Sequence, residues 1–246
     1  MSIPSDAEAT AEPLLVGTSL TKEYGNLVAL DDVDVSLESG EIVGLIGPNG
    51  AGKTTLFNCM AGAEHPTGGT VTLLGEDITG LSGHEIARRG LGRTFQIARP
   101  LEDLTVLENV MVSAHIHTKR RRRAKEIARE QLELIGLEDK LEMNAGELTI
   151  SYQRMLELAR ALATDPIVLF IDEIMAGLTP TEVNAFMDVL RTVSQDGRSI
   201  FIIEHDMRAI MEISDRVVVL DQGQVIARGD PQTVSNEEVV INAYLG

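Results

Sequence analysis

Residues 47–54 read Gly47-Pro48-Asn49-Gly50-Ala51-Gly52-Lys53-Thr54 and match the pattern G-x-x-x-x-G-K-[ST]. The segment 41–47 is continuously apolar, as expected of a strand covered on both faces, and a helix is predicted to start near Lys53. In such a strand–loop–helix unit the glycines let successive backbone N–H groups point inward at a polyphosphate, and the helix adds its positive end. Lys53 can reach the outer phosphates and Thr54 can ligate Mg²⁺. The predicted nucleotide-binding residues of this segment are Gly47, Pro48, Asn49, Gly50, Ala51, Gly52, Lys53, Thr54 and Thr55.

Other apolar segments predict the sheet around this loop. Runs at 167–171, 199–203 and 217–220 are continuously apolar, which indicates a parallel sheet with both faces covered. Residues 14–20 and 27–37 instead alternate apolar and polar side chains, as half-buried antiparallel strands do. The sequence therefore predicts an α/β fold, a P-loop NTPase core with a mostly parallel sheet and an N-terminal antiparallel β subdomain.

Helix signals complete the predicted organisation. Capping boxes at Thr105 and Thr179 should each begin a helix, the second with a proline at its first position. Residues 100–164 show helical periodicity without a convincing strand, which predicts an α-helical lobe inserted into the core. Residues 1–13 lack apolar periodicity and are expected to form a disordered leader before one domain over 14–246.

Composition excludes several classes of protein. The chain has 246 residues, 38 of them acidic and 21 basic, so its net charge of −17 argues against a nucleic-acid partner bound by bulk positive charge. The single cysteine excludes a disulfide framework and points to an intracellular protein. No export signal is present and no apolar run approaches the ~18 residues of a membrane span. We therefore expect any work at a membrane to depend on another subunit.

Charge is distributed unevenly along the chain. Six of the 21 basic residues fall between Lys119 and Lys125. A solvated face is the default interpretation, and attraction to an anionic cytoplasmic leaflet or an acidic partner loop is a weaker one. The acidic surplus elsewhere suits either a high-salt habitat or an ordinary acidic cytoplasmic protein.

Polar side chains follow two of the predicted parallel strands. Asp172 and Glu173 come directly after the strand at 167–171, at the end where ligands of open α/β sheets bind. Asp172 can hold Mg²⁺ directly or through water, and Glu173 can orient or deprotonate an attacking water. His205 follows the strand at 199–203 and can donate to a γ-phosphate oxygen, while Gln96 can reach the metal or the water. Taken alone, His205 would be interpreted as a structural residue and Gln96 as a polar surface residue.

The order of these residues resembles that of the ATP-binding cassette (ABC) ATPases, over about residues 14–246. Within that superfamily the chain is similar to the ATPase subunits of branched-chain amino acid importers. The segments that carry this likeness are 47–60, 93–96, 176–182, 203–207 and 243–246.

The resemblance implies a cytoplasmic subunit whose ATP-driven dimer closure opens and closes a separate transmembrane partner. It implies that Tyr24 stacks on adenine, although core packing is the alternative for this tyrosine. It also implies that Gln96 couples the site to the membrane subunit, that Glu173 is the catalytic base and that His205 is the switch histidine. ATP and Mg²⁺ are the implied cofactors, with Thr54, Gln96 and Asp172 on the metal.

One element departs from the family pattern. The signature segment, usually Leu-Ser-x-Gly-Gln, falls at 148–152 and reads Leu-Thr-Ile-Ser-Tyr. In the family this segment contacts the γ-phosphate on the other subunit, so Thr149 and Ser151 are carried over as nucleotide contacts. Ser151 keeps a backbone N–H and can cap the helix. Its side chain and Tyr152 are nevertheless expected to hold two subunits slightly apart and to affect catalytic rate.

The resulting prediction is an Mg²⁺-dependent ATPase that powers a membrane importer, with branched-chain amino acids as the solutes. The alternatives are the ATPase of a lipid or lipopolysaccharide export system and a weakly hydrolysing nucleotide-binding regulatory half. The expected partners are transmembrane permease subunits and a second ATPase subunit, identical or different. The expected location is the cytoplasmic face of the cell membrane, as a peripheral protein.

Overall fold

The computed structural model describes residues 13–94 and 100–245. Residues 1–12 of the predicted leader, the segment 95–99 that contains Gln96, and Gly246 lie outside the described residues. Within the described ranges, no helix is both long enough and apolar enough to cross a bilayer.

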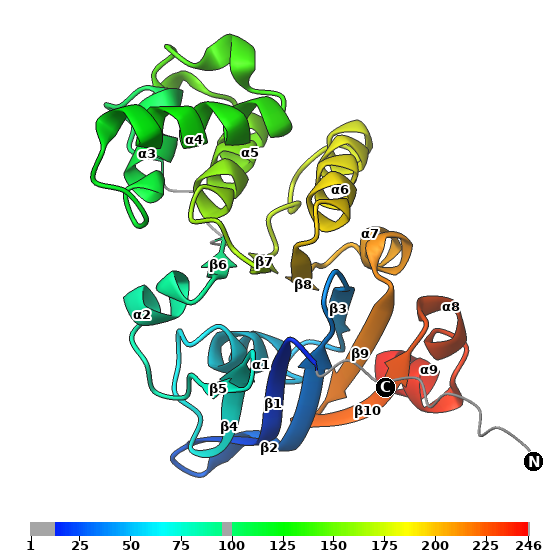
Figure 1. The fold of residues 1–246 in the computed structure, drawn as a ribbon. Helices are drawn as coiled ribbons and strands as arrows, with labels where there is room; N and C mark the ends of the chain where they lie inside the picture. Colours follow the sequence, from blue (N-terminus) through cyan, green and yellow to red (C-terminus); the bar gives the residue numbers. More distant parts are fainter. Residues whose placement is uncertain (1–12, 95–99, 246) are drawn as a thin grey trace, which may run out of the picture.

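A six-stranded sheet lies at the middle of the molecule (Figure 1), with strand order β10-β9-β3-β8-β7-β6. Its strands are β3 (Ile42–Ile46), β6 (Leu91–Arg93), β7 (Val168–Asp172), β8 (Ser199–Ile203), β9 (Arg216–Asp221) and β10 (Gln224–Gly229). All neighbouring strands are parallel except β9 and β10, which pair antiparallel. The prediction of a mostly parallel sheet is confirmed, and the four predicted segments are β3, β7, β8 and β9.

Each face of this sheet packs against its own apolar core, which explains the continuously apolar strands. In β7 and β8, residues Leu169, Ile171, Ile200 and Ile202 belong to the core shared with the helical lobe and helices α6 and α7. The residues between them belong to the other core, shared with α1 and the antiparallel sheet. In that second core, Phe57 of α1 packs edge-on against Phe170, with ring centroids 4.9 Å apart.

The antiparallel sheet has the strand order β2-β1-β4-β5. Its strands are β1 (Leu15–Tyr24), β2 (Leu27–Leu37), β4 (Gly68–Leu73) and β5 (Glu76–Asp77). The predicted pair at 14–20 and 27–37 corresponds to β1 and β2, and β1 runs four residues further than predicted, to Tyr24. That extension brings Tyr24 beside the loop at 47–54.

Helices fill the chain between β6 and β7 (Figure 1). They are α3 (Val106–Ala114), α4 (Arg121–Leu134) and α5 (Ile150–Leu162), with short 3₁₀ turns at Glu138–Lys140 and Ala145–Glu147. Thr105 and Glu108 form the expected capping box at the start of α3. The inserted helical lobe is therefore present, and the basic run lies at the start of α4, on exposed side chains.

The remaining helices surround the sheets. They are α1 (Lys53–Met60), α2 (Gly83–Arg88), α6 (Pro180–Gln195), α7 (Met207–Ile213), α8 (Pro231–Val234) and α9 (Glu238–Leu245). The capping box of Thr179 and Glu182 begins α6 as predicted.

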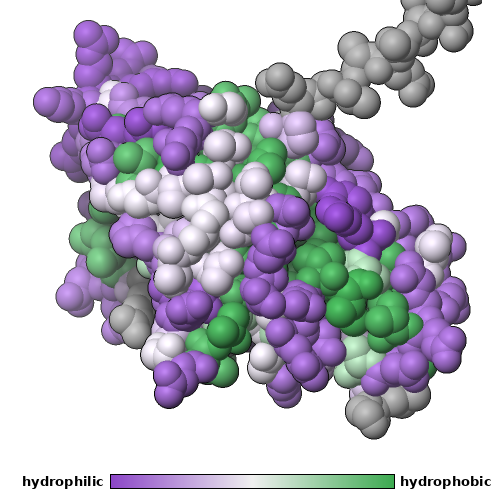
Figure 2. Space-filling model, turned by 90° about the horizontal axis from the view of Figure 1, so that it is seen from below, coloured by the Kyte–Doolittle hydropathy of each residue, from purple (hydrophilic) through white to green (hydrophobic). Residues whose placement is uncertain are grey.

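Figure 2 shows the face seen from below, where hydrophilic residues separate several apolar areas. Exposed apolar side chains include Leu27 and Val28 on β2, beside the predicted nucleotide loop.

Candidate nucleotide-binding site

The loop at 47–54 joins β3 to α1 and is held close to the sheet. Gly47 (φ 151°) and Gly52 (φ 100°) lie in the region that favours glycine. A Cβ atom on Gly47 would collide with the carbonyl oxygen of Leu220, and one on Gly52 would lie 2.5 Å from the carbonyl oxygen of Ala29. Glycine is therefore required where the loop passes β9 and β2, in agreement with the G-x-x-x-x-G spacing.

Lys53 lies inside the curve of this loop. Its Nζ atom donates hydrogen bonds to the carbonyl oxygens of Gly47 at 2.7 Å and Pro48 at 2.9 Å. Burial lowers the pKa of the Lys53 ammonium, while the nearby Glu173 carboxylate acts in the opposite direction. The ammonium is thus held over the loop, on the side where a phosphate would enter.

A cavity of about 660 Å³ opens beside the loop. It is lined by Tyr24, Leu27, Val28, Ala29, Asn49, Gly50, Ala51, Gly52, Lys53, Thr54, Thr55, Glu173, His205, Gln222 and Gly223. One part of this lining is aromatic or apolar, and another part is formed by backbone N–H groups and an ammonium. A ligand with a flat apolar group at one end and phosphates at the other matches that distribution.

Tyr24 is on the apolar part of the cavity and is 46% exposed. Its hydroxyl donates to Glu64 Oε1 at 2.5 Å, and the Lys22 ammonium lies 5.1 Å from the ring centroid. The hydrogen bond to Glu64 and burial together raise the pKa of the Tyr24 hydroxyl. These contacts orient the ring, while much of it stays accessible to a planar ligand. The alternative of core packing does not fit this exposure.

Glu173 and His205 meet at the carboxyl ends of β7 and β8. His205 Nε2 lies 2.9 Å from Glu173 Oε1, and the Glu173 backbone N–H donates to Ile203 O at 2.9 Å. Glu173 is 9% exposed, whereas the His205 side chain is 62% exposed. Glu173 has φ 46°, a conformation that costs a residue other than glycine about 1–2 kcal/mol. Adjacent parallel strands thus bring the two residues together, as the sequence predicted.

Asp172 is 6% exposed and is ion-paired, with Arg93 Nη2 lying 3.1 Å from its Oδ2. Burial raises the pKa of Asp172, and Arg93 partly offsets that effect. Arg93 also donates to Asn58 Oδ1 at 2.8 Å. Asp172 is not among the residues that line the 660 Å³ cavity. The structure thus places this predicted metal ligand behind Glu173, next to an arginine that the sequence analysis did not connect with it.

Thr149 and Ser151 lie at the start of α5, away from the residues that line the cavity. Thr149 is the N-cap, and its hydroxyl accepts a hydrogen bond from Tyr152 N at 3.5 Å. The pKa of the Glu182 carboxyl at the start of α6 is lowered, mainly by its hydrogen bonds with Thr179 and to a lesser extent by the nearby Ser151 side chain. Tyr152 is 39% exposed and lies under Lys140, with Nζ 4.6 Å from the ring centroid. The Tyr152 side chain is thus held by a contact within this chain, and Ser151 lies near the start of α6.

Glu204 is a buried acid that the sequence analysis did not select. It is 5% exposed, and its Oε1 accepts a hydrogen bond from Met175 N at 2.9 Å. Burial is the main cause that raises the pKa of its carboxyl to about 7, and the nearby Glu173 charge adds to the rise. The one feature of the sequence that could have pointed to Glu204 is its position between the predicted strand β8 and His205. A glutamate side chain does not by itself indicate burial.

The raised pKa of Glu204 makes a prediction about stability. An ordinary glutamate with a pKa of 4.5 is ionised in the unfolded chain from about pH 5 upward, whereas Glu204 holds its proton in the folded chain up to about pH 7. The contribution of Glu204 to the free energy of unfolding is therefore intact below pH 4.5 and is lost as the pH rises through 7. Between pH 5 and 8 the wild type should lose about 3 kcal/mol relative to Glu204→Gln. Urea unfolding of both proteins at pH 5, 6.5 and 8 measures this difference, and a difference that does not change with pH contradicts the prediction.

Comparisons with known proteins agree with this geometry. A family model described as ABC transporter matches residues 30–176. The chain is 40% identical to BraF of Pseudomonas aeruginosa, a high-affinity branched-chain amino acid transport ATP-binding protein, with 96% of this chain and 99% of that protein covered. It is 41% identical to LivG of Escherichia coli, which has the same description and the same coverage. It is 35% identical to LptB of Haemophilus influenzae, a lipopolysaccharide export system ATP-binding protein, with 95% of this chain and 97% of that protein covered.

Solved structures show the same fold. The ADP conformation of MJ1267, an ATP-binding cassette of an ABC transporter, superimposes with a TM-score of 0.87 at 29% identity and covers 96% of this chain and 100% of that one. A dimeric post-hydrolysis structure of the cassette MJ0796, bound to ADP and Pi, gives a TM-score of 0.78 at 25% identity, with coverages of 88% and 98%. The α/β fold class predicted from the sequence is confirmed.

Proposed function

This chain belongs to the ABC transporter family, and from that membership we propose that it is the ATP-binding and ATP-hydrolysing subunit of a membrane importer for branched-chain amino acids. The observation that carries the proposal is the single cavity in which Lys53, Glu173 and His205 meet the loop at 47–54. The names of BraF and LivG support the importer and its solutes. The ATPase domain is assigned to residues 14–246, with a helical lobe over about 100–164.

The nucleotide is assigned to the 660 Å³ cavity. Adenine stacks on Tyr24 and lies against Leu27 and Val28, which are apolar and exposed. The phosphates lie over the backbone N–H groups of residues 47–55, with Lys53 at the outer phosphates. This assignment is supported by the division of the cavity into an apolar and a phosphate-binding part.

Mg²⁺ is proposed as the metal, held by Thr54 and Asp172 together with the phosphates. Hydroxyl and carboxylate oxygens are the donors that Mg²⁺ prefers, and it is commonly bound by one or two carboxylates plus substrate phosphates. Within the described ranges, no cluster of three His, Cys, Asp or Glu side chains is placed to hold a metal. A Mg²⁺ ion held by Thr54 and Asp172 would neutralise phosphate charge. Gln96 is proposed as a further ligand and as the link to the permease, and it lies outside the described residues.

Hydrolysis is assigned to Glu173 and His205. Glu173 accepts a proton from the attacking water, and the 2.9 Å contact with His205 orients its carboxylate. The imidazole is largely exposed and can also donate to a γ-phosphate oxygen. Lys53 and the loop N–H groups stabilise the charge that develops on the phosphate, because phosphoryl transfer depends mainly on positioning and electrostatics.

A second ATPase subunit is proposed as the partner across the nucleotide. Its support is the dimeric MJ0796 structure and the separation of Thr149 and Ser151 from this chain's own cavity. In the proposed dimer, these residues contact the nucleotide of the other subunit. The contact with Lys140 turns the Tyr152 side chain toward its own subunit, and Ser151 lies near Glu182 of the same subunit, which argues against the expected separation of the two subunits.

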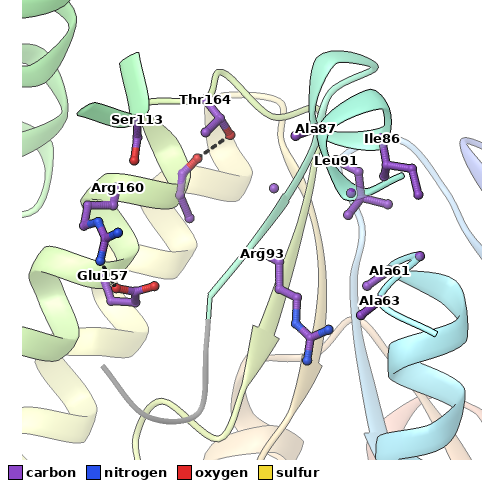
Figure 3. A pocket seen from close by; sticks show the side chains of 14 residues that line it. Ala61, Ala63, Ile86, Ala87, Leu91, Arg93, Ser113, Glu157, Arg160 and Thr164 are labelled. Carbon is purple, nitrogen blue, oxygen red and sulfur yellow. Dashed lines mark hydrogen bonds and ion pairs between the residues drawn. The ribbon is translucent and has the colours of Figure 1, made fainter. Parts of the chain in front are cut away.

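Permease subunits are assigned to a second cavity, of about 340 Å³, between the core and the helical lobe (Figure 3). Its lining is largely apolar, from Ala61, Ile86 and Leu91 on the core side, with the Glu157–Arg160 ion pair on α5. Arg93, which pairs with the proposed metal ligand Asp172, also lines this cavity. His117 Nε2 lies 2.7 Å from Thr164 O at its rim, two residues before the basic run. The largely apolar cavity and the basic run near its rim together support a peripheral position at the cytoplasmic face of the membrane.

Nucleotide binding can be tested by thermal unfolding with and without Mg-ATP. A ligand present at 100 times its dissociation constant adds about 2.7 kcal/mol to the free energy of unfolding, which corresponds to about 5–10 °C in a chain of this size. EDTA should remove turnover and much of the shift without unfolding the apo chain. A melting temperature that saturating Mg-ATP leaves unchanged contradicts the nucleotide assignment.

The transported solute requires the complete transporter. The chain should be co-purified with the membrane subunits encoded beside its gene and reconstituted in proteoliposomes. We expect ATP-dependent uptake of labelled leucine, isoleucine or valine, and no uptake with Glu173→Gln in the same complex. ATP-dependent extraction of lipid or lipopolysaccharide, without amino acid uptake, would instead favour the export alternative.

A further inference from the structure

The turn after β7 is buried and begins with Glu173 in a left-handed conformation. Ile174 is 0% exposed and Met175 is 3% exposed, so their backbone N–H groups are also removed from water. Buried N–H groups require acceptors. No strand continues at this point, and the acceptors must come from elsewhere in the fold.

Glu204 supplies them from the end of β8. Its Oε1 accepts the Met175 N–H at 2.9 Å, and the backbone N–H groups of Ile174 and His205 are close enough to lower the pKa of its carboxyl in part. One buried side chain therefore binds the turn that follows Glu173, while its own backbone leads directly into His205. Glu204 itself lines a smaller cavity of about 280 Å³ beside Lys53, not the 660 Å³ cavity assigned to the nucleotide.

We infer that Glu204 is a positioning residue for ATP hydrolysis, which fixes Glu173 and His205 relative to each other through the backbone on either side of them. The inference rests on the proposed function, because it concerns the same reacting centre. Glu204 is not among the residues that line the cavity assigned to the nucleotide. Glu204 affects the rate of hydrolysis through Glu173, because the Glu173 carboxylate must be held where it can accept a proton from the attacking water.

The chemistry of the contact explains why a glutamate occupies this place. Above its pKa of about 7 the Glu204 carboxyl is ionised, and both of its oxygens are then acceptors only, which suits several neighbouring N–H groups at once. A glutamine of the same shape keeps one acceptor but turns an NH₂ group toward a backbone donor. A misplacement of about 1 Å at a reacting group can cost about a hundredfold in rate, so loss of one of these bonds is enough to reduce turnover.

The test is the steady-state ATPase rate of the full chain carrying Glu204→Gln. We expect kcat to fall about tenfold to a hundredfold, with KM for ATP changed less than about twofold. Glu41→Gln is the matched control, because Glu41 is also a partly buried, hydrogen-bonded carboxylate, paired with Arg216 at the opposite end of the sheet. It should keep its kcat.

A double-mutant cycle separates positioning from a general structural role. In single-turnover assays, Glu204→Gln should cause no further loss once Glu173→Gln has removed the base. Full turnover of Glu204→Gln, or an unchanged kcat with a raised KM, overturns the inference and leaves the proposed function standing. An additive loss in the Glu173→Gln background overturns it as well. Normal turnover by Glu173→Gln alone instead overturns the proposed function.

A second variant covers the case in which Glu204→Gln does not fold. Glu204→Asp keeps the carboxylate and withdraws it by one methylene, so its melting temperature should stay near that of the wild type while kcat falls. If a folded Glu204→Asp protein has wild-type kcat, the position of this carboxylate does not matter and the inference is wrong.

Discussion

Glu173→Gln should lower the ATPase rate by a factor of about 10²–10⁴ while ATP still binds. Removal of a general base typically costs that much, because the water then lacks a proton acceptor at the moment of attack. Glutamine keeps the size of the side chain and one oxygen, so the contact with His205, now 2.9 Å, can persist. The backbone bond from Glu173 N to Ile203 O does not depend on the side chain. The fold should therefore be unaffected.

Two measurements define this result. Single-turnover hydrolysis of labelled ATP gives the rate, and the Mg-ATP shift in melting temperature shows that binding is retained. The variant should also accumulate as an ATP-bound dimer in size-exclusion chromatography, because hydrolysis no longer ends the bound state. A rate within a few fold of the wild type removes Glu173 from its proposed role.

Lys53→Ala should weaken nucleotide binding about tenfold to a hundredfold and abolish hydrolysis. A hydrogen bond to a charged group contributes about 1.5–3 kcal/mol, which is about a tenfold to a hundredfold change in affinity. Loss of charge stabilisation at the transferring phosphate adds a factor of about 10²–10³ in rate. The variant also loses the two bonds from Lys53 Nζ to Gly47 O and Pro48 O. The close approach of the loop to β9 and β2 at Gly47 and Gly52 does not involve the Lys53 side chain and should persist.

Isothermal titration and the ATPase assay measure these effects. Arg191→Ala is a suitable control, since it removes a cation whose ion pairs to Asp188 and Glu212 lie on the surface, and such pairs contribute little. It should bind ATP like the wild type. If Lys53→Ala retains wild-type affinity, the nucleotide must bind elsewhere.

Local sequence patterns predicted the parts of the fold in which neighbours along the chain decide the structure. The apolar runs predicted β3, β7, β8 and β9 because each of these strands is buried on both faces. The capping boxes located the starts of α3 and α6 because their hydrogen bonds span three residues. The strands β6 and β10 were not predicted: β6 has three residues, and β10 is only partly buried at the sheet edge.

Contacts between distant segments could not be read from the chain. Arg93 and Asp172 are 79 residues apart and are paired only because β6 lies beside β7. The burial of Glu204 depends on the turn after β7, and nothing in Glu204-His205-Asp206 distinguishes the buried acid from the exposed one. The effect of Ser151 on the pKa of Glu182 requires that α5 and α6 start near each other. Sequence therefore supplied the candidate residues, and the packing of the strands supplied their partners.

The bond from Glu173 N to Ile203 O extends the hydrogen-bonded ladder of β7 and β8 by one residue beyond the strand. Amide protons in such a central ladder exchange with solvent only when a large part of the molecule opens. The backbone that carries the proposed base thus belongs to the slowest-exchanging region, whereas Thr149 starts α5 at an exposed end. The amide proton of Glu173 should therefore exchange with solvent far more slowly than that of Thr149.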